Sequence, residues 1–245
     1  MIYNNYFNGN AGQPVKAGYP LYGFWSYSFA GLDPANGYPN FNNIEFEKAD
    51  NTMDPTDFLV FSGSLQPYFT GGFNTRIRYK DFSIGTSFSA LLGSKKRLSN
   101  PYSNFTNGKI PDPYYNLQKT LNDRWKKPGD ELHTIIPALY TSGDPIKEPL
   151  TLKLPNGLEN VNRYDMWALS DAMVASGNFL RCNMINASYS LPSHLLSKFG
   201  AQSLQFTATM SNVFFIASKR WNGFDPELGN GTHPHVYTVG INLGF

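Results

Sequence analysis

Residues 69–90 read FTGGFNTRIRYKDFSIGTSFSA, and apolar and polar side chains alternate through both halves of this stretch. In 69–79, one parity carries Phe69, Phe73, Ile77 and Tyr79, and the other carries Thr70, Asn74, Arg76 and Arg78. A period of two residues is typical of a β-strand whose two faces meet different media. Only Lys80 and Asp81 separate the halves, so the stretch predicts a tight antiparallel hairpin without the usual turn glycine.

The same alternation recurs elsewhere and predicts further strands at 19–29, 179–190, 203–212 and 235–245, with 69–79 and 82–90 forming the hairpin. In 179–190 the pattern changes phase, which predicts a β-bulge. Leu180, Cys182 and Met184 share one parity there, and Ile185, Ala187 and Tyr189 share the other. The fold class predicted from these patterns is all-β.

Composition limits the classes of function. The chain has 245 residues, of which 16% are charged and 16% aromatic, and its net charge is only +2. No basic run exceeds SKKR at 94–97, so nucleic-acid binding is not expected. A single cysteine, Cys182, excludes an internal disulfide. No apolar run is long enough for a membrane helix. The first residues lack the features of a signal peptide, so if the protein is exported, the chain is expected to start downstream of a precursor's beginning.

The connections between the predicted strands alternate in length. Residues 30–67, 92–177 and 213–234 form long connections, whereas 80–81 and 191–202 are short. Long loops at one end and short turns at the other are typical of transmembrane β-barrels, with the long loops outside the cell. The pattern therefore predicts an antiparallel barrel segment whose long connections are extracellular, and external labelling of Lys126 or Lys127 but not Lys198.

Five stretches resemble, in order, the C-terminal portion of SusC/RagA-family TonB-dependent outer-membrane transporters. They are GYPLYGFWSYSFAGLDPANGYP (18–39), SGSLQPYFTGGFNTRIRYKDFSIGTSF (62–88), RWKKPGD (124–130), SGNFLRCNMINASYSLPSHLLSKFG (176–200) and SNVFFIASKRWNGFDPELG (211–229). Val213 stands where the family usually has Leu, and Phe224 stands where Tyr is common. Both differences are conservative.

The resemblance implies a 22-stranded barrel with a plugged lumen. About six strands cannot close such a barrel, so residues 1–245 are interpreted as a C-terminal barrel portion without plug domain or signal peptide. The family further implies the outer membrane of a Gram-negative cell, a SusD-like surface lipoprotein as partner, and coupling to TonB through the missing N-terminal part. Phe245, a terminal aromatic residue, resembles the signal that outer-membrane assembly machinery recognises. Membrane lipid is the remaining expected partner, and no cofactor is expected.

Three tryptophans in or beside the predicted loops, Trp125, Trp167 and Trp221, are the candidate contacts for a ligand or partner, because an exposed ring stacks on sugars. Packing between loops and placement in the interfacial aromatic belt are the alternatives. His233, His235, Asp225 and Glu227 lie close in sequence, but their spacing is not a known zinc pattern. We interpret the two histidines as surface residues and the Asp225 region as a turn held by its side chain.

The leading functional hypothesis is the barrel wall and extracellular loops of a TonB-dependent importer for a nutrient such as glycan or peptide fragments. The alternative is a secreted β-sandwich that binds carbohydrate, which requires the apolar stripes to face a common core. The sequence contains no catalytic arrangement of the known motif types, so enzymatic activity is not expected.

Overall fold

The computed structural model describes residues 6–7, 16–42, 55–102, 114, 116–139, 150–154, 157–196 and 200–245. The chain divides into two compact units, which are treated separately below. The aromatic unit comprises Met1–Leu65 and Lys95–Ala175, and the sheet unit comprises Gln66–Ser94 and Ser176–Phe245. Among the described residues, no helix is long and apolar enough to cross a membrane.

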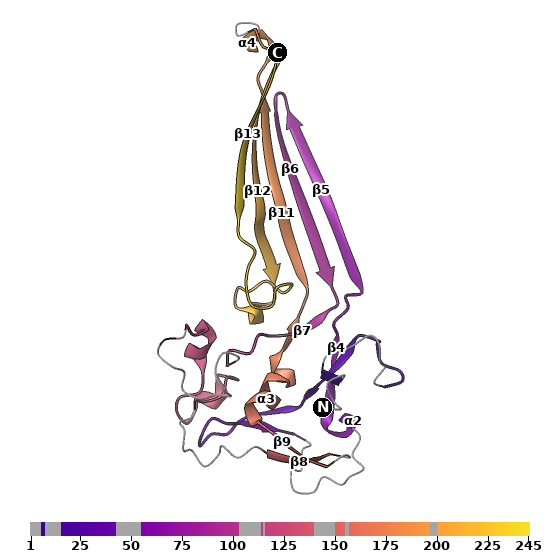
Figure 1. Cartoon of the computed structure of the whole chain (residues 1–245), viewed down its shortest axis with the longest axis vertical. Helices are drawn as coiled ribbons and strands as arrows, with labels where there is room; N and C mark the ends of the chain where they lie inside the picture. Colours follow the sequence, from indigo (N-terminus) through magenta and orange to yellow (C-terminus); the bar gives the residue numbers. More distant parts are fainter. Residues whose placement is uncertain are drawn as a thin grey trace. The chain divides into compact units, whose positions relative to one another are not determined.

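The sheet unit is one antiparallel sheet of five strands in the order β13-β12-β11-β6-β5 (Figure 1). The strands are β5 (Phe69–Tyr79), β6 (Phe82–Leu92), β11 (Phe179–Ser190), β12 (Ser203–Ala217) and β13 (Val236–Gly244). They lie at the residues where alternation places five of the six expected strands, and β12 extends five residues beyond the predicted 203–212. The predicted all-β antiparallel class is confirmed, although the described strands form an open sheet.

The β5–β6 hairpin has the predicted two-residue turn. Tyr79 pairs with Phe82, so Lys80 and Asp81 alone form the connection. Lys80 adopts a positive φ of 51°, which supplies the backbone twist that a glycine usually provides in such turns. This turn, the short helix α4 (Ser193–Leu196) and the C-terminus lie at the same end of the sheet (Figure 1).

The predicted bulge lies in β11 between Cys182 and Met184, where Asn183 is the extra residue against β6. Against β12 the extra residue lies in β12, because Asn212 and Val213 oppose the single Asn183. The shift comes one residue earlier than the side-chain pattern indicated. Met184 therefore pairs with Ser87 and Ser211 on the polar face, and does not share a face with Cys182 as predicted. The pattern was ambiguous because Met184 is an apolar residue on a polar surface.

The sixth predicted strand, 19–29, is wrong in extent and in pairing. The chain forms β1 (Gly23–Tyr27), which pairs with β4 (Leu59–Ser64), and then β2 (Phe29–Leu32), which pairs with β3 (Pro39–Phe41). All five residues of β1 are buried, so both of its faces pack against protein. The segment belongs to the aromatic unit, and no pairing links β1 to the five-stranded sheet.

The segments expected to be long irregular loops contain secondary structure in their described parts. Residues 30–67 include the short helix α2 (Pro55–Phe58) in addition to most of β2 and all of β3 and β4. Residues 92–177 include a hairpin of β8 (Leu150–Leu154) with β9 (Gly157–Val161), and a pair formed by β7 (Lys95–Arg97) and β10 (Val174–Ser176). Their helices are η1 (Lys119–Asp123), η2 (Asp130–Leu132), α3 (Arg163–Ala168) and η4 (Asp171–Met173), and η6 (Lys219–Trp221) follows β12.

The helix α3 joins two aromatic clusters in the core of the aromatic unit. Its Asn162 N-cap accepts a hydrogen bond from the Tyr164 backbone, which fixes the helix start. Met166 packs into the first cluster, and the adjacent Trp167 packs into the second. The first cluster contains Phe7, Trp25, Tyr27, Phe58, Leu59 and Met166, and the second contains Tyr38, Tyr102, Leu121, Tyr164, Trp167 and Met173.

Three polar side-chain groups of the second cluster donate to one short segment, 135–138. The Trp167 indole donates to the Ile135 carbonyl at 2.9 Å, the Tyr102 hydroxyl to Pro137 at 2.6 Å, and the Tyr164 hydroxyl to Ala138 at 2.5 Å. Burial raises the pKa of Tyr102 above its ordinary value, so this hydroxyl stays protonated as a donor. Large rings are buried here without leaving these donors unpaired.

Candidate functional site

One face of the sheet unit is apolar and exposed. Ile77 is 67% exposed, Tyr237 71% and Val239 81%, although hydrophobic side chains of this size are normally buried in a folded domain. The strand register places the apolar side chains of all five strands on the same face of the sheet. Its large members include Phe69, Phe73, Ile77, Tyr79, Phe82, Ile84, Leu92, Tyr189, Phe206, Phe214, Ile216, Tyr237, Val239, Ile241 and Leu243.

Side chains on the apolar face pack against one another or form hydrogen bonds with one another. The Phe73 and Phe88 rings stack with centroids 4.7 Å apart, and Phe88 meets Phe214 edge-on at 6.4 Å. Cys182 pairs in register with both Phe88 and Phe214 and is fully buried, so it is a small packed side chain. Thr75 and Thr86 share a 2.6 Å hydrogen bond, so each hydroxyl has a protein partner on this face. A face of this composition tolerates an apolar medium.

The opposite face is polar and almost uncharged across its centre. Serine, threonine and asparagine side chains bond from strand to strand: Ser83 to Ser188 at 2.8 Å, and Asn186 to Thr209 at 2.7 Å. The Thr207 hydroxyl donates to the Gly240 carbonyl at 3.3 Å. Arg76 and Arg78 lie on this face in the terminal strand β5. The two faces therefore suit different surroundings, lipid or another apolar phase on one side and water on the other.

An ion cluster joins the polar face to the connection between β12 and β13. Arg181, on β11, donates through Nη2 to both carboxylate oxygens of Asp225 at 2.7 and 2.5 Å, and through Nη1 to Glu227 at 2.5 Å. The Asp225 side chain is only 2% exposed and that of Arg181 11%, whereas Glu227 is 41% exposed. The guanidinium also lies 4.9 Å from the centre of the Phe179 ring. Arg181 thus compensates a buried carboxylate that would otherwise be strongly unfavourable.

The connection itself is a compact turn. The backbone N–H of Asp225 donates to the Gly231 carbonyl at 2.8 Å, and its side chain accepts from the Glu227 backbone at 2.9 Å. Asn222, Gly223 and Gly229 have positive φ angles of 50°, 87° and 79°, which reverse the chain on either side. The predicted turn held by Asp225 is confirmed. Its second role, pairing with Arg181, is a contact between distant residues that no local pattern could indicate.

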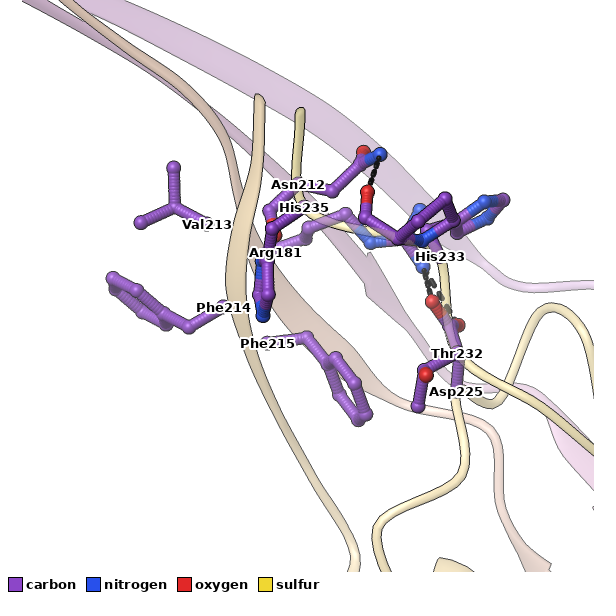
Figure 2. Close-up of a pocket in the computed structure, with 10 residues that line it drawn as sticks. Arg181, Asn212, Val213, Phe214, Phe215, Asp225, Thr232, His233 and His235 are labelled. Atoms are coloured by element: carbon purple, nitrogen blue, oxygen red, sulfur yellow. Dashed lines mark hydrogen bonds and ion pairs between the residues drawn. The ribbon is translucent and has the colours of Figure 1, made fainter. Parts of the chain in front are cut away.

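A cavity of about 410 Å³ lies between this turn and the bulged part of β12 (Figure 2). The side chains of Phe214 and Phe215 project to opposite sides of β12, and Phe215 lies on the side of Asp225 (Figure 2). Asn212, with φ of 56°, donates to the Pro234 carbonyl at 2.9 Å, and its own carbonyl lies 2.5 Å from His235 Nδ1. That contact places the Nδ1 proton toward Asn212.

His233 and His235 are exposed, and both line the cavity together with Arg181 and Asp225. The described residues contain no group of three His, Cys, Asp or Glu side chains placed to hold a metal ion. The two histidines are therefore placed as the sequence predicts, on the surface beside the Asp225 turn.

The three candidate tryptophans are packed against protein to different degrees. Trp167 is fully buried in the second aromatic cluster, and Trp221 is 2% exposed with its indole donating to the Ser176 carbonyl at 2.8 Å. Neither ring is open to a ligand. Both tryptophans are packed against protein, which was the alternative to stacking on a ligand. Trp125 is partly exposed and covers Gly37, where an added side chain would overlap the indole ring.

The motif around Trp125 forms a hydrogen-bonded turn. The backbone N–H groups of Lys126 and Lys127 donate to Asp130 at 3.0 and 3.1 Å. Glu131 accepts from the Gly129 N–H at 2.7 Å and from the Trp125 indole at 3.2 Å. Gly129 has a φ of 101°, which explains the glycine of the sequence motif. The turn presents Lys126 and Lys127 to solvent.

Known proteins resemble the chain over most of its length. No family profile matches it. The TonB-dependent receptor P3 of Formosa agariphila is 20% identical over 266 aligned positions, which cover 95% of this chain and 23% of that receptor. The RagAB peptide transporter has a TM-score of 0.59 at 20% identity, and the RagAB peptide importer in its open-open state has 0.57 at 21%.

These structural matches cover 91% of this chain and 23% and 22% of the matched chains. The chain thus spans about a quarter of the length of the relatives it matches. The resemblance to part of a SusC/RagA-type TonB-dependent transporter, expected from the sequence motifs, is confirmed.

Proposed function

We propose that this chain, which resembles part of a SusC/RagA-type TonB-dependent transporter, supplies barrel wall and extracellular connections to an outer-membrane nutrient importer. The observation that carries the proposal is the exposed apolar face of the sheet unit, backed by a polar face whose side chains bond to one another. In a barrel wall the first face contacts lipid and the second contacts the aqueous lumen.

The proposal includes a closed barrel of 22 strands, of which this chain provides a part. Within the described sheet, β5 pairs only with β6 and β13 pairs only with β12, so each has one strand edge open for a further partner. Unpaired backbone groups are not tolerated in the hydrocarbon core, so barrel closure requires neighbouring strands at both edges. The rest of the transporter would supply those strands, the plug and the segment that engages TonB.

The two ends of the sheet differ in the way the proposed orientation requires. At one end, the chain returns through the two residues Lys80 and Asp81 and through the compact α4 connection, 191–202. At the other end lie the Asp225 turn and the cavity beside it. We assign the short turns and Phe245 to the periplasmic side and the longer connections, with the exposed Trp125 turn, to the side where a SusD-like lipoprotein docks.

The proposed cargo is a nutrient fragment of glycan or peptide type. The named relatives include a peptide importer, which supports transport rather than catalysis. The alternative, a secreted carbohydrate-binding β-sandwich, is not favoured, because its apolar stripes would have to be covered, and in the sheet unit they are exposed. An enzyme is not proposed.

Adjacent residues on β13 give a direct test of the two-faced wall. Val239 lies on the apolar face and Thr238 on the polar face. In a Cys182→Ala background, the chain carries a fluorescent label at Val239→Cys or, as matched control, at Thr238→Cys, and is reconstituted, together with the rest of the proposed barrel, into vesicles containing brominated lipid. We expect strong quenching at position 239 and weak quenching at 238. Equal quenching at both positions, or a stable soluble monomer without detergent, contradicts the proposal.

Labelling of intact cells tests the orientation. An impermeant amine reagent is expected to reach Lys126 and Lys127, which are exposed on the Trp125 turn, and to miss Lys80 in the hairpin turn. Lys198, also expected to be protected, lies outside the described residues. Labelling of Lys80 with protection of Lys126 and Lys127 would reverse the topology.

A further inference from the structure

A second hollow, of about 590 Å³, lies on the polar face over β5, β6 and β11. Gly72, on the polar face, contributes no side chain to its floor, and an added Cβ there would lie 2.9 Å from the Phe88 carbonyl oxygen. Its polar lining comes from three strands and the Asp225 turn: Thr70, Asn74, Ser87, Ser89, Asn183 and Glu227. The hollow is distinct from the cavity beside His233, which β12 and the Asp225 turn enclose.

Unused hydrogen-bonding groups converge on this hollow. The bulge places Asn183 in its wall, where the side-chain oxygen accepts from Ser89 at 3.2 Å. Within the described part of the chain, the Asn183 amide N–H groups and the Ser87 hydroxyl have no protein partner. Glu227 gives one carboxylate oxygen to Arg181 and has its other oxygen unpaired among the described residues. The site therefore offers both donors and acceptors to a ligand.

The charges around the hollow exclude acidic ligands. None of the described residues that line it is Lys, Arg or His. The nearby Arg181 guanidinium is neutralised by Asp225 and Glu227 through both of its terminal nitrogens. Arg76 follows Asn74 on the polar face of β5 but does not line the hollow. An anionic ligand inside the hollow would therefore lose its water without a cation in the lining, and it would approach the Glu227 carboxylate.

Few apolar groups are available for a peptide's side chains. Phe73, Phe88 and Ala90 contribute backbone to the lining, but their side chains belong to the opposite face in register. Leu91 and Phe179 lie on the polar-face side of the register. Phe179 is buried with the Arg181 guanidinium against its ring, so the partly exposed Leu91 is the apolar side chain that the lining offers. Hydroxyl, amide and carboxylate groups on neighbouring strands, about 5 Å apart, suit a ligand that carries many hydroxyl groups at similar spacing.

We infer that this hollow is a binding site for a neutral, hydroxyl-rich ligand of the carbohydrate class, on the wall that the proposed function turns toward the lumen. The inference rests on that proposed function and narrows its cargo. Binding depends on side-chain hydrogen bonds with little stacking, so it is weak and selective against charge, as suits a ligand that must move on.

Titration of the full 245-residue chain in detergent tests the site. The probes are maltohexaose, laminarihexaose, xylohexaose and mannohexaose as neutral oligosaccharides, with hexagalacturonate and pentaalanine as the acidic and peptide comparisons. We expect saturable binding of at least one neutral probe and none of the other two. Asn183→Ala should weaken that binding about tenfold, and Ser89→Ala by less. Asn242→Ala is the matched control, since Asn242 lies on the same polar face outside the hollow.

Introducing a positive charge into the hollow should change its selectivity between neutral and acidic oligosaccharides. Asn74 is exposed on β5 and lines the hollow, so Asn74→Lys should create measurable affinity for hexagalacturonate. The inference is overturned if only hexagalacturonate or pentaalanine binds the unaltered chain, if Asn242→Ala weakens neutral binding as much as Asn183→Ala does, or if no neutral probe binds. The lipid-quenching result at Val239 and Thr238 distinguishes the failures: strong quenching at 239 with no neutral binding refutes the site and leaves the barrel-wall proposal standing.

Discussion

The two units of the chain use aromatic residues in opposite ways. In the aromatic unit, Trp167 and Tyr102 are buried and donate their polar hydrogens to carbonyl groups. In the sheet unit, Tyr237 and Phe73 are exposed, and only the polar face of the sheet carries a network of side-chain hydrogen bonds. The aromatic unit is organised as a domain in water, whereas the sheet unit has the inverted arrangement that an apolar solvent requires.

Truncating a buried ring should produce the largest effect and confirm the interior of the aromatic unit. Trp167→Ala removes a fully buried side chain from the second cluster and should cost about 3–5 kcal/mol of unfolding free energy. Phe206→Ala, at a ring 41% exposed on the apolar face, is the control and should cost much less. Urea unfolding in detergent, followed by near-ultraviolet circular dichroism, measures both. Equal costs would remove the distinction between the units.

The ion cluster should show the next largest effect, because it is the buried charge of the sheet unit. Arg181→Met leaves Asp225 buried without its cation and should cost about 3 kcal/mol. The double variant Arg181→Met with Asp225→Leu should recover most of that loss. Glu227→Gln alters the exposed partner and should cost under about 1 kcal/mol. The same urea titration applies, and a double variant no more stable than Arg181→Met would show that the charge pair is not the cause.

Placing a charge on either face of β13 tests whether the sheet unit turns its apolar face outward to lipid. Val239→Arg introduces a cation on the apolar face and should cost about 2 kcal/mol of stability in a bilayer. Thr238→Arg introduces the same side chain on the polar face and should be nearly neutral. Reversible unfolding from lipid vesicles measures both stability changes. A larger loss of stability for Thr238→Arg than for Val239→Arg would mean that the polar face, and not the apolar face, contacts lipid.

Alternation sufficed to predict the sheet unit because successive residues of each strand face different media. The hairpin at Lys80–Asp81 followed from the strand limits, and the bulge in β11 from the phase change. The same reasoning failed at 19–29, because β1 is buried on both faces and its aromatic residues carry no alternation. A period of two is informative only where the two faces differ.

The candidate site was predictable only where its contacts are local. The Asp225 turn uses hydrogen bonds two to six residues apart, and turn-forming residue types indicate it. Arg181 lies 44 residues from Asp225, and its pairing depends on how the connection folds back onto β11. Trp167 and Trp221 were candidates because they lie in predicted loops, but those segments fold and bury them.

The hairpin turn offers a smaller test within the sheet unit. Lys80 has a φ of 51°, a left-handed conformation that asparagine adopts more readily than lysine. Lys80→Asn should therefore stabilise the chain by about 0.5 kcal/mol in detergent. Asp81→Asn is the matched control, since Asp81 is not among the described residues with positive φ. A loss of stability at position 80 would mean that the Lys80 ammonium, 5.4 Å from the Tyr79 ring centre, contributes more than the backbone does.

The Trp125 turn gives the smallest effect, a local dependence on pH confined to the aromatic unit. Hydrogen bonds from its own backbone N–H, and then from Gly129 and Trp125, lower the pKa of Glu131 below its ordinary value. A carboxylate with a lowered pKa in the folded state stabilises the turn fully above its ordinary pKa. That contribution is lost as the pH falls from the ordinary pKa through the lowered one, because protonation removes the negative charge and weakens the oxygen as an acceptor.

The amide protection factor of Gly129, measured by hydrogen exchange, should therefore stay constant at neutral pH and fall only as the pH drops below the ordinary pKa of a glutamate. Glu131→Gln should lower the protection at neutral pH and abolish most of its dependence on pH. Asp123→Asn, an exposed carboxylate on η1 outside this network, should leave both unchanged. If protection in Glu131→Gln still falls with acid as in the unaltered chain, another group controls the turn, with Asp130 the next candidate through its bonds to Lys126 and Lys127.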